Sequence, residues 1–406
     1  MLRIAGASIR CMKNILARIP AQSAAVLLAA GVALLSCVSL HAQEPVKVPM
    51  TADRWETKGT AEFTQQDGLA VAKVTKGVAI LKDFNFRNGT IEFDVSPLGS
   101  MGAGIGFRRR DDQTYEDFYL RPRPACDKAV DCMQYAPETH GVLLWDVFPQ
   151  YQSPAPLKDG TWNHIKLVIS GQRMNIYVNG ATSPTLAVPR LEGDTLEGGV
   201  LLQGPGMFAN LTIAPDAVDG LTPEPAADAS ASDPHIVRKW QLSPWTTLEA
   251  SKEPAYSDLP AASAQWTSIE AEREGLVNIS RVDGLPTDRK TRTLAWIKTS
   301  ITSKHAQTTQ VDFGWVREAW VFVNGKLIYA DKNMYMPETA RKKPDGRLSL
   351  ENGSFALPLK AGKNEIAIAV ASQFYGWGVK MRLADTKGIE LAEQWAQQPA
   401  SAKQGQ

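Results

Sequence analysis

The chain has 406 residues, of which 44 are basic and 43 acidic, and its formal net charge is +1. This balance, without any basic cluster, argues against nucleic acid or an anionic membrane surface as a partner. The length is too great for one ordinary core and fits two domains. No apolar segment is long enough to predict a membrane span.

The first 42 residues have the layout of a secretory signal peptide. Basic residues at positions 3, 10, 13 and 18 precede the apolar run 24–35, and "LHA" ends in the small residue Ala42. We expect initiation at Met12, cleavage after Ala42 and a mature net charge of −3, since the leader holds four basic residues and no acidic one. The alternative is a lipoprotein signal ending at Cys37, in which Leu35 fits poorly. The protein is therefore predicted to be exported to the periplasm or the extracellular space.

Two cysteines follow this leader, Cys126 and Cys132, in the polar loop "PACDKAVDCMQY". In an exported protein such a close pair predicts a disulfide. Closing so short a loop would stabilise the fold by about 2 kcal/mol in the chain-entropy model. A zinc site is not supported, because no second thiol pair accompanies the two residues.

Short β-rich runs separated by Gly, Asp, Asn or Pro fill residues 45–215. They include "GTIEFDV", "AGIGFRRR", "DFYLRPR", "HIKLVIS" and "RMNIYVNG". Their spacing predicts an all-β sandwich or jelly-roll domain rather than alternating βαβ units. Residues 216–238 are rich in Pro, Ala, Asp and Ser, a composition that predicts a flexible linker.

A second set of strands predicts another β-sandwich over residues 239–385, followed by a polar tail over 386–406 that begins with a short helix. "IYVNG" at 176–180 and "VFVNG" at 321–325 share an Asn-Gly pair. Both positions of that pair tolerate positive φ, as a type I′ turn requires. The flanking sequences do not align, so the repeat indicates shared turn chemistry and not a duplicated domain.

The runs "FYLRPR" and "WNHIKLVISGQRMNIYVNG" give the first domain its family resemblance. It resembles the concanavalin A-like jelly roll, and within that fold the laminin-G-type and bacterial 3-keto-disaccharide-hydrolase-type modules. The resemblance implies two antiparallel sheets whose concave face meets carbohydrate. The second domain, through "VFVNGKLIYADKN", "LPLKAGKNEIAIAV" and "FYGWGVKMRL", is similar to galactose-binding-like β-sandwiches. That similarity implies a fold and no particular ligand.

The hairpin from residue 104 to 123 is the main candidate for a binding surface. Alternation places its apolar side chains on one face and its Gly, Arg and Tyr residues on the other. Aromatic rings pack on the C–H patches of sugars, and charged side chains hydrogen-bond their hydroxyl groups. We expect an oligo- or polysaccharide ligand. The predicted ligand-binding residues are Arg108, Tyr119, Arg121, Arg123, Tyr135 and Trp145. The alternative is a solvated face, or one covered by the second domain, that is held by Arg–Asp pairs.

The sequence contains no complete catalytic set. Glu92 and Asp94 lie about 6.5 Å apart along a strand, a separation at which carboxylate pairs hydrolyse glycosides. Pro97, however, stands where the laminarinase-type hydrolases of this fold place a third acid. His140 is the one histidine that remains a candidate acid or base. The motifs G-x-S-x-G, H-E-x-x-H, Walker A and C-x-x-C are absent.

Three functions therefore remain open. The leading one is carbohydrate binding without catalysis. A glycoside-processing hydrolase of the 3-keto-disaccharide-hydrolase type is the alternative enzyme, although that family's N-S-G-[IV]-x-x-R stretch stands here only as "GAGIGFRRR". A protein-interaction module without a sugar ligand is the third. No cofactor is expected. The alternative is a structural calcium ion, for which the carboxyl groups of Asp111, Asp112 and Asp127 are available as ligands.

Overall fold

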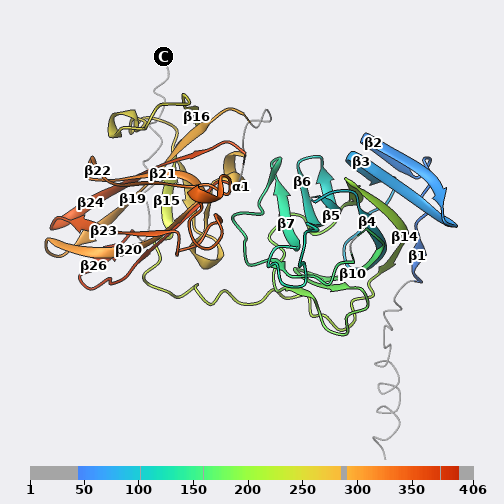
Figure 1. Cartoon of the computed structure of the whole chain (residues 1–406). Helices are drawn as coiled ribbons and strands as arrows, with labels where there is room; N and C mark the ends of the chain where they lie inside the picture. The colour runs from blue at the N-terminus through green and yellow to red at the C-terminus, as the bar shows by residue number, and fades with distance from the viewer. Residues whose placement is uncertain (1–43, 101, 159, 285–289, 375, 393–406) are drawn as a thin grey trace, which may run out of the picture. The chain divides into compact units, whose positions relative to one another are not determined.

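The computed structural model describes residues 44–100, 102–158, 160–284, 290–374 and 376–392 (Figure 1). The predicted signal peptide, Met12 and Cys37 lie outside the described residues, as does residue 393 onward. The structure is 51% strand and 4% helix, with antiparallel pairing between its strands, which confirms the predicted all-β class. None of its helices is long and apolar enough to cross a membrane.

The first fourteen strands form one curled antiparallel sheet. Their bounds are β1 Val46–Lys47, β2 Trp55–Gln66, β3 Leu69–Leu81, β4 Gly89–Pro97, β5 Ala103–Asp111, β6 Thr114–Leu120, β7 Met133–Thr139, β8 Val142–Leu143, β9 Gln152–Ser153, β10 Asn163–Ser170, β11 Arg173–Val178, β12 Leu186–Val188, β13 Gly199–Gln203 and β14 Gly206–Pro215. The strand order is β12-β11-β10-β4-β14-β3-β13-β5-β6-β7-β8. The predicted hairpin is β5 and β6, which lies between β13 and β7 in the sheet. Figure 1 labels β5, β6 and β7 beside one another.

Alternation of side chains explains why this sheet curls around a core. In β10 the residues Ile165, Leu167 and Ile169 are fully buried, while His164, just before them, is exposed and Lys166, between them, is half-buried. Because successive side chains of a strand point to opposite faces, one face of the sheet becomes apolar and closes on itself. The core that results also contains Phe107 of β5 and its neighbours from the other strands.

The second series of elements forms two facing sheets. Their bounds are β15 Lys239–Leu242, β16 Thr246–Thr247, η1 Tyr256–Asp258, β17 Thr267–Glu270, η2 Arg273–Gly275, β18 Val277–Asn278, α1 Ser280–Asp283, β19 Thr293–Ser303, β20 Gln307–Trp315, β21 Arg317–Val323, β22 Lys326–Asn333, η3 Glu338–Ala340, β23 Gly353–Leu359, β24 Gly362–Ser372, β25 Gly378–Leu383 and β26 Ile389–Leu391. One sheet runs β17-β15-β19-β24-β21-β22, and the other β18-β25-β20-β23.

The core of this second sandwich is rich in tryptophan. Trp240, Trp315 and Trp377 are fully buried in it. The residues after 386 contribute a strand, β26, that pairs with β19 where a short helix was expected. The expectation was wrong because Ile389 packs into the core, so the backbone there is tied to the sheet edge.

Residues 216–238, the predicted linker, carry backbone hydrogen bonds to both sandwiches. The amide of Gln172 donates to the carbonyl of Pro223 over 3.0 Å, and the amide of Leu383 donates to the carbonyl of His235 over 2.9 Å. The segment therefore follows the surface of the described structure, and its flexibility stays a prediction.

Both Asn-Gly pairs have the positive φ values that the sequence predicts. Asn324 and Gly325, at 49° and 85°, join β21 to β22 directly, since Val323 pairs with Lys326. Asn179 and Gly180, at 53° and 75°, instead begin the longer connection from β11 to β12. The turn conformation is the same in both places, but only Asn324 and Gly325 form a two-residue hairpin.

Candidate functional site

Three of the predicted ligand-binding residues lie together on the face of β6 and β7 that points away from the core. Arg121 donates to the hydroxyl group of Tyr119 and to Oε1 of Gln134, each over 2.6 Å. Its guanidinium group also lies over the rings of Tyr119 and Trp145, at 4.8 and 5.3 Å from their centroids. We call Tyr119, Arg121, Gln134 and Trp145 the Tyr119 cluster.

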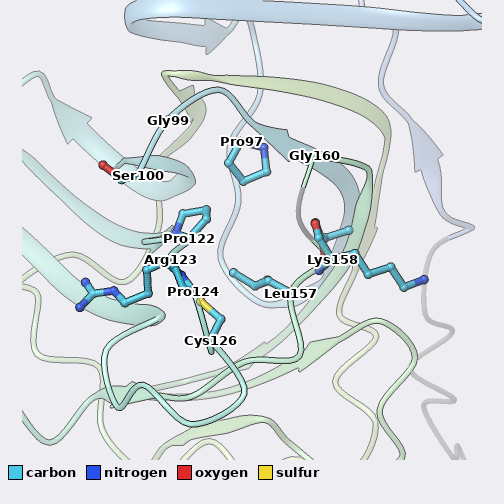
Figure 2. Close-up of a pocket in the computed structure, with 11 residues that line it drawn as sticks. Pro97, Gly99, Ser100, Pro122, Arg123, Pro124, Cys126, Leu157, Lys158 and Gly160 are labelled. Atoms are coloured by element: carbon cyan, nitrogen blue, oxygen red, sulfur yellow. Dashed lines mark hydrogen bonds between the residues drawn. The ribbon is translucent and has the colours of Figure 1, made fainter.

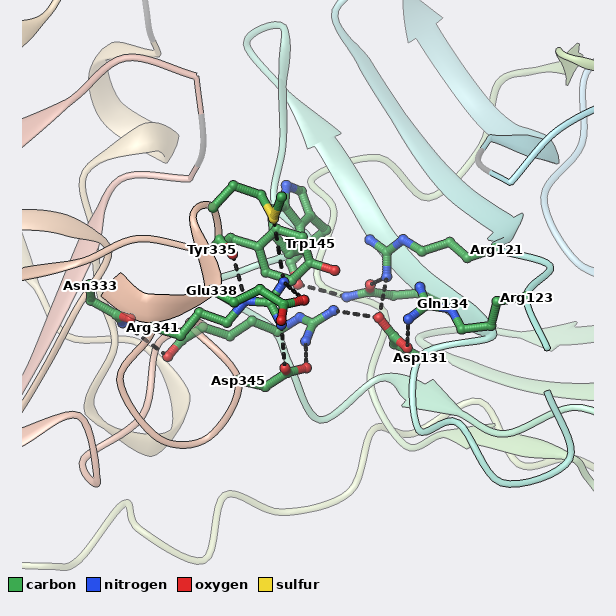
Figure 3. A network of polar contacts seen from close by, with 12 residues as sticks. Arg121, Arg123, Asp131, Gln134, Trp145, Asn333, Tyr335, Glu338, Arg341 and Asp345 are labelled. Carbon is green, nitrogen blue, oxygen red and sulfur yellow. Dashed lines mark hydrogen bonds and ion pairs between the residues drawn. The ribbon is translucent and has the colours of Figure 1, made fainter. Parts of the chain in front are cut away.

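The Tyr119 cluster is covered by the second sandwich. Tyr335 packs its ring edge-on against Trp145, with centroids 4.9 Å apart (Figure 3). Arg347 is fully buried, lies over Trp145 and forms an ion pair with Asp131 over 3.1 Å. Only 4% of Tyr119 and 8% of Trp145 is exposed. The face is therefore not the open surface that the leading hypothesis requires, and a role for these residues in ligand binding stays a prediction.

Arg108 and Tyr135 do not join that cluster, contrary to the face assignment made from alternation. A register shift between Phe107 and Asp111, with Arg108 at a φ of 52°, turns the Arg108 side chain away from the glycine face. Its guanidinium group donates instead to the carbonyls of Arg87 and Gly171, over 2.6 and 2.7 Å. Tyr135 pairs with Phe118 and faces the core, so Gln134 takes the place on the outer face.

Arg108 and Tyr135 lie near a polar hollow of about 700 Å³. We call it the acid–arginine hollow. Its lining residues are Gly171, Gln172, Arg190, Glu192, Gly193, Asp194, Leu196, Pro223, Glu272, Arg273 and Arg281. Arg281 of helix α1 holds the wall together: it pairs with Asp194 and Glu272 and donates to the carbonyl of Glu192 over 2.8 Å.

A chain of buried hydrogen bonds lies behind this hollow. Tyr151 donates to Oε1 of Glu192, and Tyr135 donates to Oε2 of Glu116, each over 2.6 Å. The backbone amide of Glu192 in turn donates to the hydroxyl group of Tyr135 over 2.6 Å. Gly193 separates Glu116 from the hollow, since a Cβ atom at that position would come within 2.6 Å of the Glu116 carboxyl carbon.

Burial raises the pKa values of these acids. Removal from water raises the pKa of Glu116 to about 7, and it also raises the pKa of Glu192 above its ordinary value. The cause is that a low-dielectric site disfavours the charged form of a carboxyl group. A carboxyl group with a raised pKa on the wall of a hollow is a common property of functional sites.

A second hollow, of about 440 Å³, lies among the loops near the end of β4 (Figure 2). We call it the proline hollow. Pro97, Pro122, Pro124 and Leu157 contribute its apolar lining, and Arg123 and Lys158 its charged groups. The predicted disulfide between Cys126 and Cys132 is confirmed and lies at this hollow. Arg123, the remaining predicted ligand-binding residue, is exposed here and pairs with Asp131 over 3.0 Å.

The other sequence candidates lie apart from both hollows. Glu92 and Asp94 are on the outer face of β4, where His164 bridges them at 3.4 and 2.9 Å. His140 is exposed in the turn before β8. Asp111 and Asp112 are engaged by arginine and lysine side chains. Among the residues that the structure describes, no group of three or more His, Cys, Asp or Glu side chains is placed to hold a metal ion.

The sequence reasoning did not identify Glu116, Glu192 and Arg281 as candidates. Glu116 is one position from the predicted face, and strand alternation assigns it to the core side, where an acid is not expected. Glu192 and Asp194 stand in "RLEGDTLEGG", an acid-rich connection with Gly that signals a surface loop and nothing more. Arg281 comes from the second sandwich, and no local signal places it beside the first.

Comparison with known proteins supports the family resemblance of the first sandwich. Residues 50–214 match the family model of the 3-keto-alpha-glucoside-1,2-lyase-like domain. The match agrees with the resemblance seen in the sequence. It covers less than half of the chain and does not include the second sandwich, whose galactose-binding-like fold stays a prediction. A search of the curated proteins gives no match.

The solved structures to which this chain is similar each match less than half of it. A Bacillus subtilis protein of unknown function with a galectin-like fold is 14% identical with a TM-score of 0.33, and covers 43% of this chain and 97% of its own. The carbohydrate-binding module CBM66 from Bacillus subtilis is 16% identical with a TM-score of 0.28, and covers 40% and 91%. A putative glycosyl hydrolase from Parabacteroides distasonis is 15% identical with a TM-score of 0.28, and covers 40% and 88%. At these values the similarities carry no conclusion about the site.

Proposed function

We propose that this protein binds a carbohydrate in the acid–arginine hollow. One observation carries the proposal: a hollow of about 700 Å³ is lined by three arginines and three acids. A sugar hydroxyl group both donates and accepts hydrogen bonds, so a wall of mixed guanidinium and carboxyl groups can satisfy both of its functions. The volume falls within the range of about 300–1,000 Å³ that is usual for small-ligand sites.

The other candidate surfaces fit a sugar less well. In the Tyr119 cluster the hydrogen-bonding groups of Tyr119, Arg121 and Gln134 are already used by one another. Among its described lining residues the proline hollow has two charged groups, Arg123 and Lys158, and both are donors. The match of residues 50–214 to a sugar-related domain agrees with a carbohydrate ligand, and most of the acid–arginine hollow belongs to that part of the chain.

Calorimetric titration with a panel of neutral oligosaccharides tests the proposal. Arg190→Ala and Asp194→Ala remove groups that are partly exposed at the hollow. Each is expected to weaken binding at least about 10-fold, which corresponds to about 1.4 kcal/mol. Lys158→Ala in the proline hollow is the matched control and leaves the affinity unchanged. Equal affinity in all four proteins would place the ligand elsewhere.

A second candidate function is conversion of the bound sugar. The name of the matched family describes a lyase-like domain that is related to 3-keto-alpha-glucosides. Glu192 favours this function, because a buried carboxyl group with a raised pKa beside a bound sugar is of the type that serves as a general acid or base. Incubation with a 3-keto-alpha-glucoside, followed by product detection, separates the two functions. Catalysis predicts product that is lost in Glu192→Gln while affinity remains, and binding alone predicts no product.

A further inference from the structure

The outer face of the first sheet contains a second polar group of residues, next to the Tyr119 cluster but different from it. Asp117 of β6 is fully buried, and neither of its carboxyl oxygens has a hydrogen-bond partner. Oε1 of Gln203, on β13, is also buried without a donor. Three oxygen atoms that normally accept hydrogen bonds are thus withdrawn from water and left unsatisfied, which proteins rarely tolerate.

The register of the strands brings these oxygens together. β5 lies between β13 and β6, and its Gly104 is opposite Gln203 while its Gly106 is opposite Asp117. Since glycine has no side chain, the side chains of Gln203 and Asp117 approach each other diagonally over β5. The space is tight: a Cβ atom on Gly106 would come within 2.9 Å of the side chains of Leu201 and Tyr115.

A second carboxyl group comes from β7 on the same face. Asp117 is opposite Ala136, and Glu138 is two residues farther along, so Glu138 is a diagonal neighbour of Asp117. We call Asp117, Glu138 and Gln203 the Asp117 cluster.

The electrostatics around Asp117 are unbalanced. Burial raises the pKa of Asp117 well above its ordinary value, and the nearby charge of Glu138 raises it further. Gln203 acts in the opposite direction, although neither carboxyl oxygen of Asp117 has a hydrogen-bond partner. Among the described residues, no lysine or arginine contributes to the shift of Asp117. A second acid and no cation therefore act on this buried carboxyl group.

We propose that the Asp117 cluster binds a hard divalent cation through the carboxyl oxygens of Asp117 and Glu138 and the amide oxygen of Gln203. Carboxylate and amide oxygens are the ligands that Ca²⁺ and Mg²⁺ prefer, and water fills their remaining positions. Zn²⁺, which prefers nitrogen and sulfur ligands, does not fit this set. The site uses two acids and an amide, and so differs from a cluster of three or more acidic, histidine or cysteine ligands. It does not depend on the carbohydrate proposal.

Thermal unfolding of the full chain after chelator treatment tests the site, with Ca²⁺, Mg²⁺ or Zn²⁺ added back. We expect Ca²⁺ or Mg²⁺ at saturation to raise the unfolding temperature by about 3 °C or more. The ion that gives the larger rise in unfolding temperature is the preferred one, and Zn²⁺ gives no rise. Terbium luminescence, excited through nearby tyrosine, measures binding directly.

Variants locate the effect. Asp117→Asn and Glu138→Gln are each expected to lose the temperature rise and to weaken terbium binding at least about 10-fold. Asp112→Asn, at the β5–β6 turn, is the control and retains both. A single protonated carboxyl group at Asp117 is the competing explanation. It predicts no cation effect in the unaltered protein, and that result, or a full effect that persists in Asp117→Asn, would overturn the proposal.

Discussion

Replacing Asp146 with asparagine tests whether burial or the neighbouring arginines decide the charge of a carboxyl group at the contact between the two sandwiches. Asp146 is only 1% exposed and accepts a hydrogen bond over 2.9 Å from the amide of Gly376. Its other carboxyl oxygen has no partner. Burial raises its pKa to about 7 from the ordinary value of 3.8, although Arg347 and Arg317 act in the opposite direction.

The sign of the pH effect follows from which state holds the proton. Between pH 3.8 and about 7 the folded protein keeps a proton on Asp146 that the unfolded chain has lost. Stability therefore falls as the pH rises through this window, by about 1.4 kcal/mol per pH unit. From pH 5 to pH 7 the loss amounts to roughly 3 kcal/mol, and above the folded pKa it levels off. Asparagine at this position cannot ionise, so this part of the loss disappears.

The measurement is the free energy of unfolding of the unaltered protein and of Asp146→Asn at several values between pH 5 and 8. The variant is expected to gain relative stability across the window by roughly 3 kcal/mol. Glu351→Gln, at an exposed position, is the control and should follow the unaltered protein. Parallel curves for Asp146→Asn would refute the argument, because a carboxyl group whose pKa the arginines hold below 3.8 is charged in both the folded and the unfolded state throughout this window.

Two further predictions concern the first sandwich. Replacing Cys126 and Cys132 with serine is expected to lower the free energy of unfolding by about 2 kcal/mol, measured in urea, because the closed loop is short. Gly193→Ala introduces a Cβ atom within 2.6 Å of the Glu116 carboxyl carbon and should destabilise the fold by about 1–3 kcal/mol. Gly199→Ala, whose nearest contact is at 3.8 Å, is the control and should change the unfolding temperature little.

Strand alternation predicted the apolar face of the β5–β6 hairpin correctly. Ile105, Phe107, Phe118 and Leu120, which alternation places on one face, are all buried in the core. The same reasoning missed β2, whose residues after Trp55 are mostly exposed and polar. A strand that pairs on one side only and buries little has no apolar period, so its backbone pairing with β3 is not visible in the sequence.

The candidate site was harder to predict because it depends on two effects that act over different distances. A local one is the β-bulge at Arg108, which reverses the side-chain direction and cannot be read from alternation. The other is long-range packing: Tyr335 and Arg347 come from more than 180 residues farther along the chain to cover Trp145. Residue chemistry correctly brought Tyr119, Arg121 and Trp145 together, but only tertiary structure determines whether such a group meets solvent.

The Tyr119 cluster and the Asp117 cluster, both on the outer face of β6, differ in whether their buried polar atoms have partners. In the Tyr119 cluster, Arg121 and Gln134 hydrogen-bond the hydroxyl group of Tyr119. Beside the cluster, Arg347 from the second sandwich forms an ion pair with Asp131. Two residues earlier on the same strand, Asp117 is equally buried and has no such partner. Burial alone cannot explain that difference, because Tyr119 and Asp117 are both buried and only Tyr119 has hydrogen-bond partners. An additional positive charge, either a proton or a cation, must accompany Asp117, and a response to Ca²⁺ or Mg²⁺ decides between them.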